Sequence, residues 1–331
     1  MFSKLKKQSF ILGLLAAVGL AFLLPSIGSD RTGFPANDLT KVGVFLIFLF
    51  QGLSLPTKEL GRGIVQWKLH LFIQLWILLG SAVVLMGMGF LLSQFTSSGI
   101  HIGFYYLALL PTTISSAVTF TTHAGGNVSA AIFNTTLSNI IGVFWVPIVC
   151  LYLFSAGGSL SEGFVFEMLL KLSKLILLPM IIGQALRPAL KNARGFQLIK
   201  PYFKTVSNFI ILYIVYVAFC RSISSNSLRD VSSIDLVLLI IFAVLSVLLV
   251  SYLVFRSAVS IFSNKEDIIA GFFCGSQKTL AAGAPIAAAL FTSANFDQIN
   301  LGVLIIPLLC YHPAQLFLAG ITSPLIRKLK L

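Results

Sequence analysis

Apolar residues form long runs along this chain, and short polar segments separate the runs. A helix needs about 20 apolar residues to cross the hydrocarbon core of a bilayer, so each run is a candidate membrane span. The runs cover residues 9–28, 39–56, 67–93, 100–122, 127–154, 164–187, 202–220, 235–260, 267–292 and 298–325. The pattern predicts an all-α membrane protein with ten transmembrane helices.

Two of these runs are interrupted by residues that break a helix. The fourth contains Pro111-Thr112-Thr113, and the ninth contains Ser276-Gln277-Lys278 followed by Gly283-Ala284-Pro285. Many transporters build their ion and substrate sites from interrupted spans of this kind, near the middle of the membrane. We therefore expect spans 4 and 9 to carry the functional site.

A shift of 160 residues aligns two pairs of segments. Gly142–Cys150 reads GVFWVPIVC and Gly302–Cys310 reads GVLIIPLLC, while Ser116–Thr119 meets Ser276–Thr279. The match predicts two halves, residues 1–155 with spans 1 to 5 and residues 160–331 with spans 6 to 10. Five spans are an odd number, so the second half enters the membrane from the opposite side. The halves are then inverted repeats, in which the broken spans 4 and 9 correspond and cross.

Composition and charge agree with a membrane protein. The mean hydropathy is +0.97 and only 10% of the residues are charged, against about 25% in soluble domains. Most Lys and Arg residues fall in segments that are cytoplasmic if both termini are, and this asymmetry is typical of membrane topology. The predicted outer segments hold only Arg31, Lys41, Arg221 and Arg229. We expect a plasma-membrane protein, in a bacterium the inner membrane, with cytoplasmic termini.

Several classes of protein and partner are disfavoured by the sequence. The basic residues lie between apolar runs and are not interleaved with exposed aromatic residues, so we expect the lipid bilayer as a partner and no nucleic acid. The N-terminal run also resembles a secretion signal, but an even number of spans requires that it is retained. No nucleophile elbow, metal motif, paired carboxylates or phosphate loop occurs. We expect neither an enzyme nor an organic cofactor, and the oligomeric state stays open.

Lys278 is the most informative single residue. An ammonium near the bilayer centre costs roughly 3 kcal/mol on insertion scales, so packing alone does not explain it. All ten Asp and Glu residues lie at span ends or in loops. Lys278 must then meet carbonyls and hydroxyls, such as those of Ser115, Ser116 or Asn127, or an anionic substrate. The lack of a carboxylate partner favours a small organic anion as substrate.

Other polar residues in the spans have two interpretations. Asn134 and Thr135 are followed four residues later by Ser138 and Asn139, so they either form hydrogen bonds between helices or face the site. His123 and His312 lie within apolar stretches. Either histidine could relay protons, and hydrogen-bonded packing is the alternative.

Four segments resemble a known family. They are Cys274–Ala281 (CGSQKTLA), Pro111–Ser116 (PTTISS), Gly126–Val128 (GNV) and Gln51–Leu55 (QGLSL). Together they resemble the bile acid:sodium symporter (BASS) superfamily, most closely its sodium-bile-acid-symporter-like branch, which includes the seventh member of human solute carrier family 10. The resemblance covers nearly the whole chain. It implies a panel of spans 1–2 and 6–7, a core of spans 3–5 and 8–10, and a substrate site between them beside the crossing spans.

The resemblance also implies sodium ligands, which can be compared one at a time. Ser116, Thr135, Gln74 and Gln277 match positions that bind Na⁺ in the family. The family's Asn next to the first of these falls on Ala117, a nearby Ser falls on Ala131, and the Glu that serves both sodium sites falls on Phe273. Lys278 follows Gln277 directly.

These departures put sodium coupling in question. A site without its carboxylate and with an added ammonium should bind Na⁺ poorly, because like charges within about 4–6 Å repel and hard cations need oxygen ligands. Two hypotheses follow. Lys278 replaces sodium as a tethered cation that braces the crossover, or it exchanges its proton and couples transport to H⁺.

The whole sequence therefore predicts a secondary active transporter of a small organic, anionic solute that works by alternating access. Either Na⁺ or H⁺ could be the coupling ion. A non-transporting membrane regulator or sensor that keeps the fold is the alternative. The predicted site comprises Gln74, Ser115, Ser116, Thr119, Asn127, Asn134, Thr135, Ser276, Gln277, Lys278 and Thr279, with His123 and His312 as proton-relay candidates.

Overall fold

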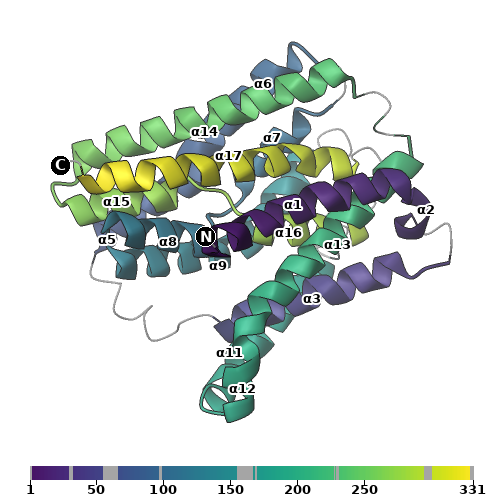
Figure 1. The fold of residues 1–331 in the computed structure, drawn as a ribbon, viewed down its shortest axis with the longest axis horizontal. Helices are drawn as coiled ribbons and strands as arrows, with labels where there is room; N and C mark the ends of the chain where they lie inside the picture. Colours follow the sequence, from purple (N-terminus) through teal and green to yellow (C-terminus); the bar gives the residue numbers. More distant parts are fainter. Residues whose placement is uncertain are drawn as a thin grey trace. The chain divides into compact units, whose positions relative to one another are not determined.

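The structure is a computed structural model of the chain. It describes residues 2–29, 33–54, 66–96, 99–154, 167, 170–226, 228, 231–293 and 300–328. Over these ranges all regular secondary structure is helical (Figure 1). The expectation of an all-α protein is confirmed.

The helices follow the apolar runs of the sequence. Their bounds are α1 Phe2–Leu23, α2 Pro25–Gly28, α3 Ala36–Ser54, α5 Trp67–Leu75, α6 Ser81–Ser93, α7 Ile102–Leu109, α8 Ile114–Ala124, α9 Val128–Phe154, α11 Leu178–Leu190, α12 Arg194–Ile199, α13 Phe203–Ser224, α14 Ser233–Ile261, α15 Lys265–Gly275, α16 Leu280–Ser293 and α17 Leu301–Lys328. Two π-helical turns, η1 (Trp76–Gly80) and η2 (Ser173–Leu177), and the 3₁₀ turn η3 (Lys200–Tyr202) interrupt or extend them.

Within the described ranges, seven helices are long and apolar enough to cross a membrane. The pair α7 and α8 is an eighth candidate, bent by 64° at a short break. The apolar stretch Phe10–Leu23 is a shorter helix. The chain is thus an integral membrane protein by its helices, while the arrangement of ten spans in two inverted repeats stays a prediction.

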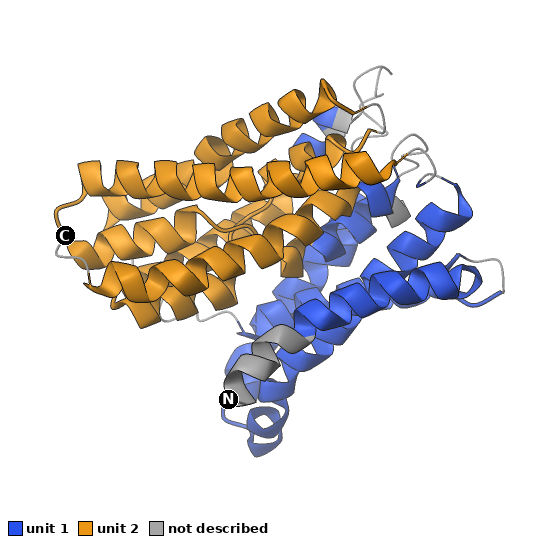
Figure 2. Cartoon of the chain, turned by 45° about the horizontal axis from the view of Figure 1, so that its top comes forward, with its two compact units in different colours: residues 1–55, 147–230, 284–303 blue, residues 56–146, 231–283, 304–331 orange. Residues whose placement is uncertain are grey.

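The chain divides into two compact units, and each is assembled from three separate stretches (Figure 2). Unit 1 comprises residues 1–55, 147–230 and 284–303, and unit 2 comprises residues 56–146, 231–283 and 304–331. The predicted halves, 1–155 and 160–331, and the predicted panel and core stay predictions.

In unit 1, α3 and α11 cross with their backbones in close approach. A Cβ atom on Gly52 would lie 2.1 Å from the carbonyl oxygen of Met180, and one on Gly183 would lie 2.4 Å from that of Leu49. Small residues are the usual way in which membrane helices approach so closely. Glycine at both positions therefore fixes this crossing.

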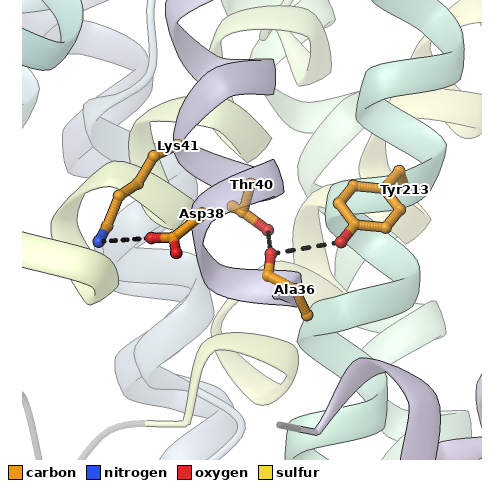
Figure 3. Close-up of polar contacts among 5 residues, drawn as sticks. All are labelled: Ala36, Asp38, Thr40, Lys41 and Tyr213. Carbon is orange, nitrogen blue, oxygen red and sulfur yellow. Dashed lines mark hydrogen bonds and ion pairs between the residues drawn. The ribbon is translucent and has the colours of Figure 1, made fainter. Parts of the chain in front are cut away.

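Polar contacts anchor the first turn of α3 in the same unit (Figure 3). The carbonyl oxygen of Ala36 accepts hydrogen bonds from Thr40 Oγ1 (2.8 Å) and from the hydroxyl of Tyr213 on α13 (3.3 Å). The neighbouring ion pair of Lys41 and Asp38, with N···O 3.3 Å, is exposed. An exposed pair of this kind contributes little, whereas the Tyr213 hydroxyl links α13 to the first turn of α3.

In unit 2, caps and a shared apolar core position the helices. Ser232 and Asp235 form a reciprocal capping box at the start of α14, and Asn264 caps α15. These caps satisfy backbone N–H groups that have no partner within the helix. The core joins α5, α9, α14 and α15 through buried side chains that include Leu69, Phe72, Ile73, Ala130, Val250, Val254, Ile268 and Cys274.

Replacement of Gly52 by Ala is expected to destabilise the protein, because the new methyl group would overlap a backbone oxygen that cannot move alone. Overpacking of this kind costs about 1–3 kcal/mol. The measurement is the melting temperature of the purified protein. Gly19→Ala is the matched control, since a Cβ at Gly19 meets no atom within 4 Å. Equal melting temperatures for the two variants would contradict the close crossing.

Candidate functional site

The break in span 4 begins at Pro111. Helix α7 ends at Leu109, Leu110 is extended (ψ 144°), and α8 starts at Ile114 with Thr113 as its N-cap. Proline lacks an N–H and pushes the residue before it out of the helical region. The sequence therefore dictates the break locally, and it leaves backbone groups without helical partners.

Span 9 is broken at the position where the sequence places its polar residues. Helix α15 ends at Gly275, and α16 begins at Leu280. The peptide groups of Ser276–Thr279 between them lie outside both helices. In a membrane, each such group must find a partner within the protein.

The two breaks meet directly. The backbone N–H of Thr279 donates to the carbonyl oxygen of Pro111 at 2.9 Å. Gln315 on α17 holds both sides of the Lys278 peptide: its Oε1 accepts from the Lys278 N–H at 2.7 Å, and its Nε2 donates to the Lys278 oxygen at 2.6 Å. The Tyr311 hydroxyl donates to the oxygen of Ser276 at 3.3 Å. Side chains of α17 thus replace the helical hydrogen bonds that span 9 lacks.

Side chains of α9 likewise form hydrogen bonds with backbone groups at the break in span 4. Asn139 Nδ2 donates to the carbonyl oxygen of Thr112 at 2.9 Å, and the Thr112 N–H donates to Ser138 Oγ at 3.2 Å. Both side chains are buried. For Ser138 and Asn139 the structure therefore shows hydrogen bonds between helical segments, which was one of the two interpretations of the polar residues on span 5.

Three carbonyl groups surround the ammonium of Lys278. Its Nζ donates to the backbone oxygens of Ile77, Ala108 and Leu110, each at 2.8 Å. The side chain is 1% exposed. An ammonium has three N–H donors, so this set of oxygens, here called the carbonyl cradle, uses all of them. The expectation of carbonyl partners is confirmed, whereas Ser115, Ser116 and Asn127 are not the partners.

The carbonyl of Ile77 is available because span 3 contains a π-helical turn. The N–H of Ser81 bonds to the oxygen of Trp76, five residues back, and not to Ile77. The freed Ile77 oxygen accepts from Ser81 Oγ at 3.0 Å and from Lys278. Single π-turns of this kind often occur at functional sites. Thus spans 3, 4 and 9 all contribute to one buried cation.

Beside the cradle, Ser116 and Gln277 join the two broken spans. Ser116 Oγ donates to Gln277 Oε1 at 2.6 Å, and Thr113 Oγ1 forms a short hydrogen bond with Ser116 Oγ. Gln277 Nε2 is buried and has no hydrogen-bond partner among the described residues. Gln277 also lines a water-sized cavity together with Ser251, Phe272, Phe273, Ser276, Gln315, Leu318 and Ala319. The Gln277 amide N–H can therefore donate to the oxygen of a water molecule or of a solute.

Phe273 lies in an aromatic cluster. It is fully buried, and its ring centroid is 5.8 Å from that of Phe120 and 4.8 Å from that of Phe272. Over the described ranges, no group of three or more His, Cys, Asp or Glu side chains is placed to hold a metal ion. Phe273 has no oxygen to offer a cation, so this position does not fit a sodium site that depends on a carboxylate there.

Gln74, Asn134 and His70 form a separate polar cluster between α5 and α9. Gln74 Nε2 donates to the backbone oxygen and to Oδ1 of Asn134 at 3.1 and 3.2 Å, and Asn134 Nδ2 lies 2.8 Å from His70 Nδ1. Thr135 Oγ1 donates to the oxygen of Ala131 in its own helix at 2.8 Å. The structure records no hydrogen bond from these residues to Ser116 or Gln277.

Asn127 links three span ends outside the crossover. Its Nδ2 donates to Gln66 Oε1 and to Asp267 Oδ1, both at 2.8 Å, and its N–H donates to the oxygen of Glu266 at 2.9 Å. Its Oδ1 accepts from the N–H of Ala130 at the start of α9. Asn127 therefore ties the turn between α8 and α9 to the first turn of α15.

The remaining predicted residues lie on α8 and α17. Thr119 Oγ1 donates to the oxygen of Ser115 at 2.6 Å. His123 is exposed in the last turn of α8, whereas His312 Nδ1 lies 2.8 Å from Gln315 Nε2. Of the two histidines, only His312 connects to the Lys278 backbone. Gln315 itself was missed, and its one sequence signal was an uncharged polar residue in an apolar span, three positions after His312.

Similarity to known proteins agrees with this geometry. Residues 8–328 match the SBF-like CPA transporter family. The chain is 31% identical to sodium/bile acid cotransporter 7 of Mus musculus over 326 residues, which cover 97% of this chain and 93% of that protein. It is 30% identical to the protein YfeH of Escherichia coli (strain K12) over 329 residues, covering 95% and 91%.

The chain belongs to the SBF-like CPA transporter family. This assignment confirms the resemblance to the bile acid:sodium symporter superfamily, and it makes the chain a membrane protein of a transporter family. The fold is also similar to that of the sodium proton antiporter MjNhaP1 from Methanocaldococcus jannaschii, with a TM-score of 0.52, 14% identity and 99% coverage of both chains. At that identity the likeness concerns the fold alone.

Replacement of Lys278 by Met is expected to cost about 2–6 kcal/mol, because the buried oxygens of Ala108 and Leu110 lose the ammonium donor and each unmet group costs about 1–3 kcal/mol, while the Ile77 oxygen keeps its bond from Ser81 Oγ. The measurement is thermal unfolding in detergent. Lys174→Met is the matched control, since Lys174 is an exposed lysine within a membrane helix. A melting temperature of Lys278→Met equal to that of the control would contradict the cradle.

A smaller variant separates the charge from the tether. Lys278→Ala leaves room for a free cation, so ammonium or methylammonium chloride should recover part of the lost melting temperature. Choline, which has no N–H donors, should recover none of it. The melting temperature of the Lys278→Met variant should not respond to ammonium or methylammonium, because the longer methionine side chain occupies the space that these cations would need.

Replacement of Gln315 by Leu is expected to cost about 2–4 kcal/mol, since it leaves the N–H and the oxygen of the buried Lys278 peptide unpaired. Gln94→Leu is the control, because Gln94 is exposed at the end of α6. The two variants can be compared by hydrogen exchange of residues 276–279 and by melting temperature. If hydrogen exchange of residues 276–279 is unchanged in Gln315→Leu, the Gln315 amide does not stabilise the backbone at this break.

Proposed function

We propose that the chain is a secondary active transporter of a small organic anion that works by alternating access, with the Lys278 ammonium in the place of sodium at the crossover. The observation that carries the proposal is the carbonyl cradle, in which Nζ meets three oxygens at 2.8 Å. Oxygen atoms are also the ligands that hard cations prefer. A tethered ammonium can therefore brace the broken spans without a bound metal ion.

Electrostatics and composition argue against a sodium ion beside this lysine. A cation bound near Gln277 would be close to a buried positive charge, and like charges at about 4–6 Å destabilise each other. The neighbouring Phe273 supplies an aromatic ring where a carboxylate would be needed, and it is fully buried. The transport cycle we propose thus needs no sodium gradient.

The division of the chain supports the proposed panel and core. Unit 1 contains the predicted spans 1, 2, 6 and 7, and unit 2 contains the predicted spans 3, 4 and 8 and both breaks, whereas the predicted spans 5, 9 and 10 are divided between the two units. The placement of the basic residues between the spans supports a topology with both termini in the cytoplasm. Each unit has its own helix contacts, as a mechanism with two moving parts requires.

The substrate class rests on the relatives and not on Lys278. A relative is named a sodium/bile acid cotransporter, and bile acids are organic anions. The sequence argument that Lys278 needs an anion no longer holds, because carbonyls occupy all of its donors. Gln277 Nε2 is a buried donor at the breaks that lacks a partner among the described residues, and we propose that it binds a solute oxygen, directly or through water.

Uptake into proteoliposomes tests the proposal. A mixture of isotope-labelled organic acids, including taurocholate, would be presented with a sodium gradient, with choline in place of sodium, or with a pH step, and mass spectrometry would measure what enters. We expect uptake to be equal in sodium and choline, and to fall at least tenfold in Lys278→Met. Uptake that requires sodium would contradict the role of Lys278. A response to the pH step alone would show proton-coupled uptake, which is what the hypothesis of proton exchange by Lys278 requires.

A further inference from the structure

The connection between α11 and α13 carries a dense group of cations in unit 1. The segment 187–204, here called the basic hairpin, contains Arg187, Lys191, Arg194, Lys200 and Lys204. No Asp or Glu occurs between Glu167 and Asp230 in the sequence. Lys191, Arg194 and Lys200 are exposed. This part of the chain therefore presents positive charge without any acidic residue of its own.

Aromatic packing holds the basic hairpin against α3. Phe196 and Phe203 are buried in a cluster with Leu53, and partly buried Leu49, Phe50 and Leu190 pack around it. The rings of Phe50 and Phe203 stack with centroids 4.4 Å apart. Figure 1 shows α12 at the end of α11. The cations thus project from a packed platform.

Large apolar side chains next to the cations in the sequence are exposed. Leu198 is 69% exposed, Ile199 is 54% exposed and Tyr202 is 66% exposed. A segment that combines exposed Leu, Ile and Tyr with Lys and Arg has the composition of an interfacial membrane segment. Tyrosine in particular is enriched at the level of the lipid headgroups.

The length of the helix places the basic hairpin at that level. Arg194–Ser224 forms one apolar candidate span of 31 residues, of which α13 alone has 22. At 1.5 Å per residue α13 is about 33 Å long, enough for the roughly 30 Å hydrocarbon core. Residues 194–202 therefore extend beyond the core into the headgroup region.

We propose that the basic hairpin is a binding site for the anionic headgroups of the surrounding bilayer, with Lys191, Arg194 and Lys200 on the lipid phosphates and Leu198, Ile199 and Tyr202 among the acyl chains. Charge complementarity selects this occupant, because phosphate is the anion that lies next to the end of a span. The site is independent of the proposed transport mechanism and lies in the unit without the carbonyl cradle.

The test uses the full-length protein in detergent, titrated with phosphatidylglycerol or phosphatidylcholine, with bound lipids counted by native mass spectrometry. Lys191→Gln, Arg194→Gln and Lys200→Gln are combined in one variant. Each cation next to an anionic surface contributes about fivefold to affinity, so the triple variant should bind phosphatidylglycerol roughly 100-fold more weakly. Phosphatidylcholine binding should not change.

A matched control removes the same charge elsewhere. Lys68→Gln, Arg256→Gln and Lys328→Gln together alter three exposed cations of unit 2, and the preference for phosphatidylglycerol should persist. High salt should abolish this preference in the unmodified protein, since screening weakens exposed charge interactions; this arm does not depend on the folding of a variant.

Three outcomes would overturn the proposal. They are a preserved preference in the triple variant, an equal loss in the control variant, and competition by inorganic phosphate or a polyglutamate peptide at the same concentration as the lipid. The last result would assign the surface to a soluble anion or to an acidic protein segment.

Discussion

Three backbone oxygens converge on the Lys278 ammonium, and the contact between the two broken spans depends on this interaction. A membrane offers no water to backbone groups that leave a helix. The breaks at Leu110–Thr113 and Ser276–Thr279 expose such groups at the same depth. One ammonium with three donors satisfies a carbonyl from span 3 and two from span 4, and its own backbone sits in span 9. The contact thus joins three spans.

Other side chains of unit 2 form hydrogen bonds with the remaining backbone groups at the two breaks. Gln315 and Tyr311 of α17 partner the break in span 9, and Asn139 and Ser138 of α9 partner that in span 4. All of these partners are neutral, and within the described ranges the recorded partners of the ammonium itself are backbone carbonyl dipoles. Buried polar networks are stable only when every member is satisfied. Among the described residues at the two breaks, Gln277 Nε2 and Thr112 Oγ1 are buried without a hydrogen-bond partner.

Much of this architecture could be predicted from the sequence. The apolar runs give the helices, because hydrocarbon forces backbone groups to pair within a segment. Pro111 gives the break in span 4, since proline removes a donor locally. The 160-residue match brought Ser116 and the break in span 9 together, and the structure places Ser116 Oγ on Gln277. The free-energy cost of burying a charge identifies Lys278 as a functional candidate from the sequence alone.

The partners themselves were decided only by the tertiary structure. The Ile77 oxygen can accept from Lys278 because one turn of span 3 is π-helical. The sequence of that turn, Trp76–Gly80 (WILLG), contains no residue that predicts it. Gln315 reaches Lys278 from 37 residues away, and Ser115 and Asn127, which looked like suitable partners, bond elsewhere. The sequence determines which groups must be satisfied, because burial and helix geometry are local properties. Which atoms satisfy them depends on how distant helices pack, and that is settled only when the chain is folded.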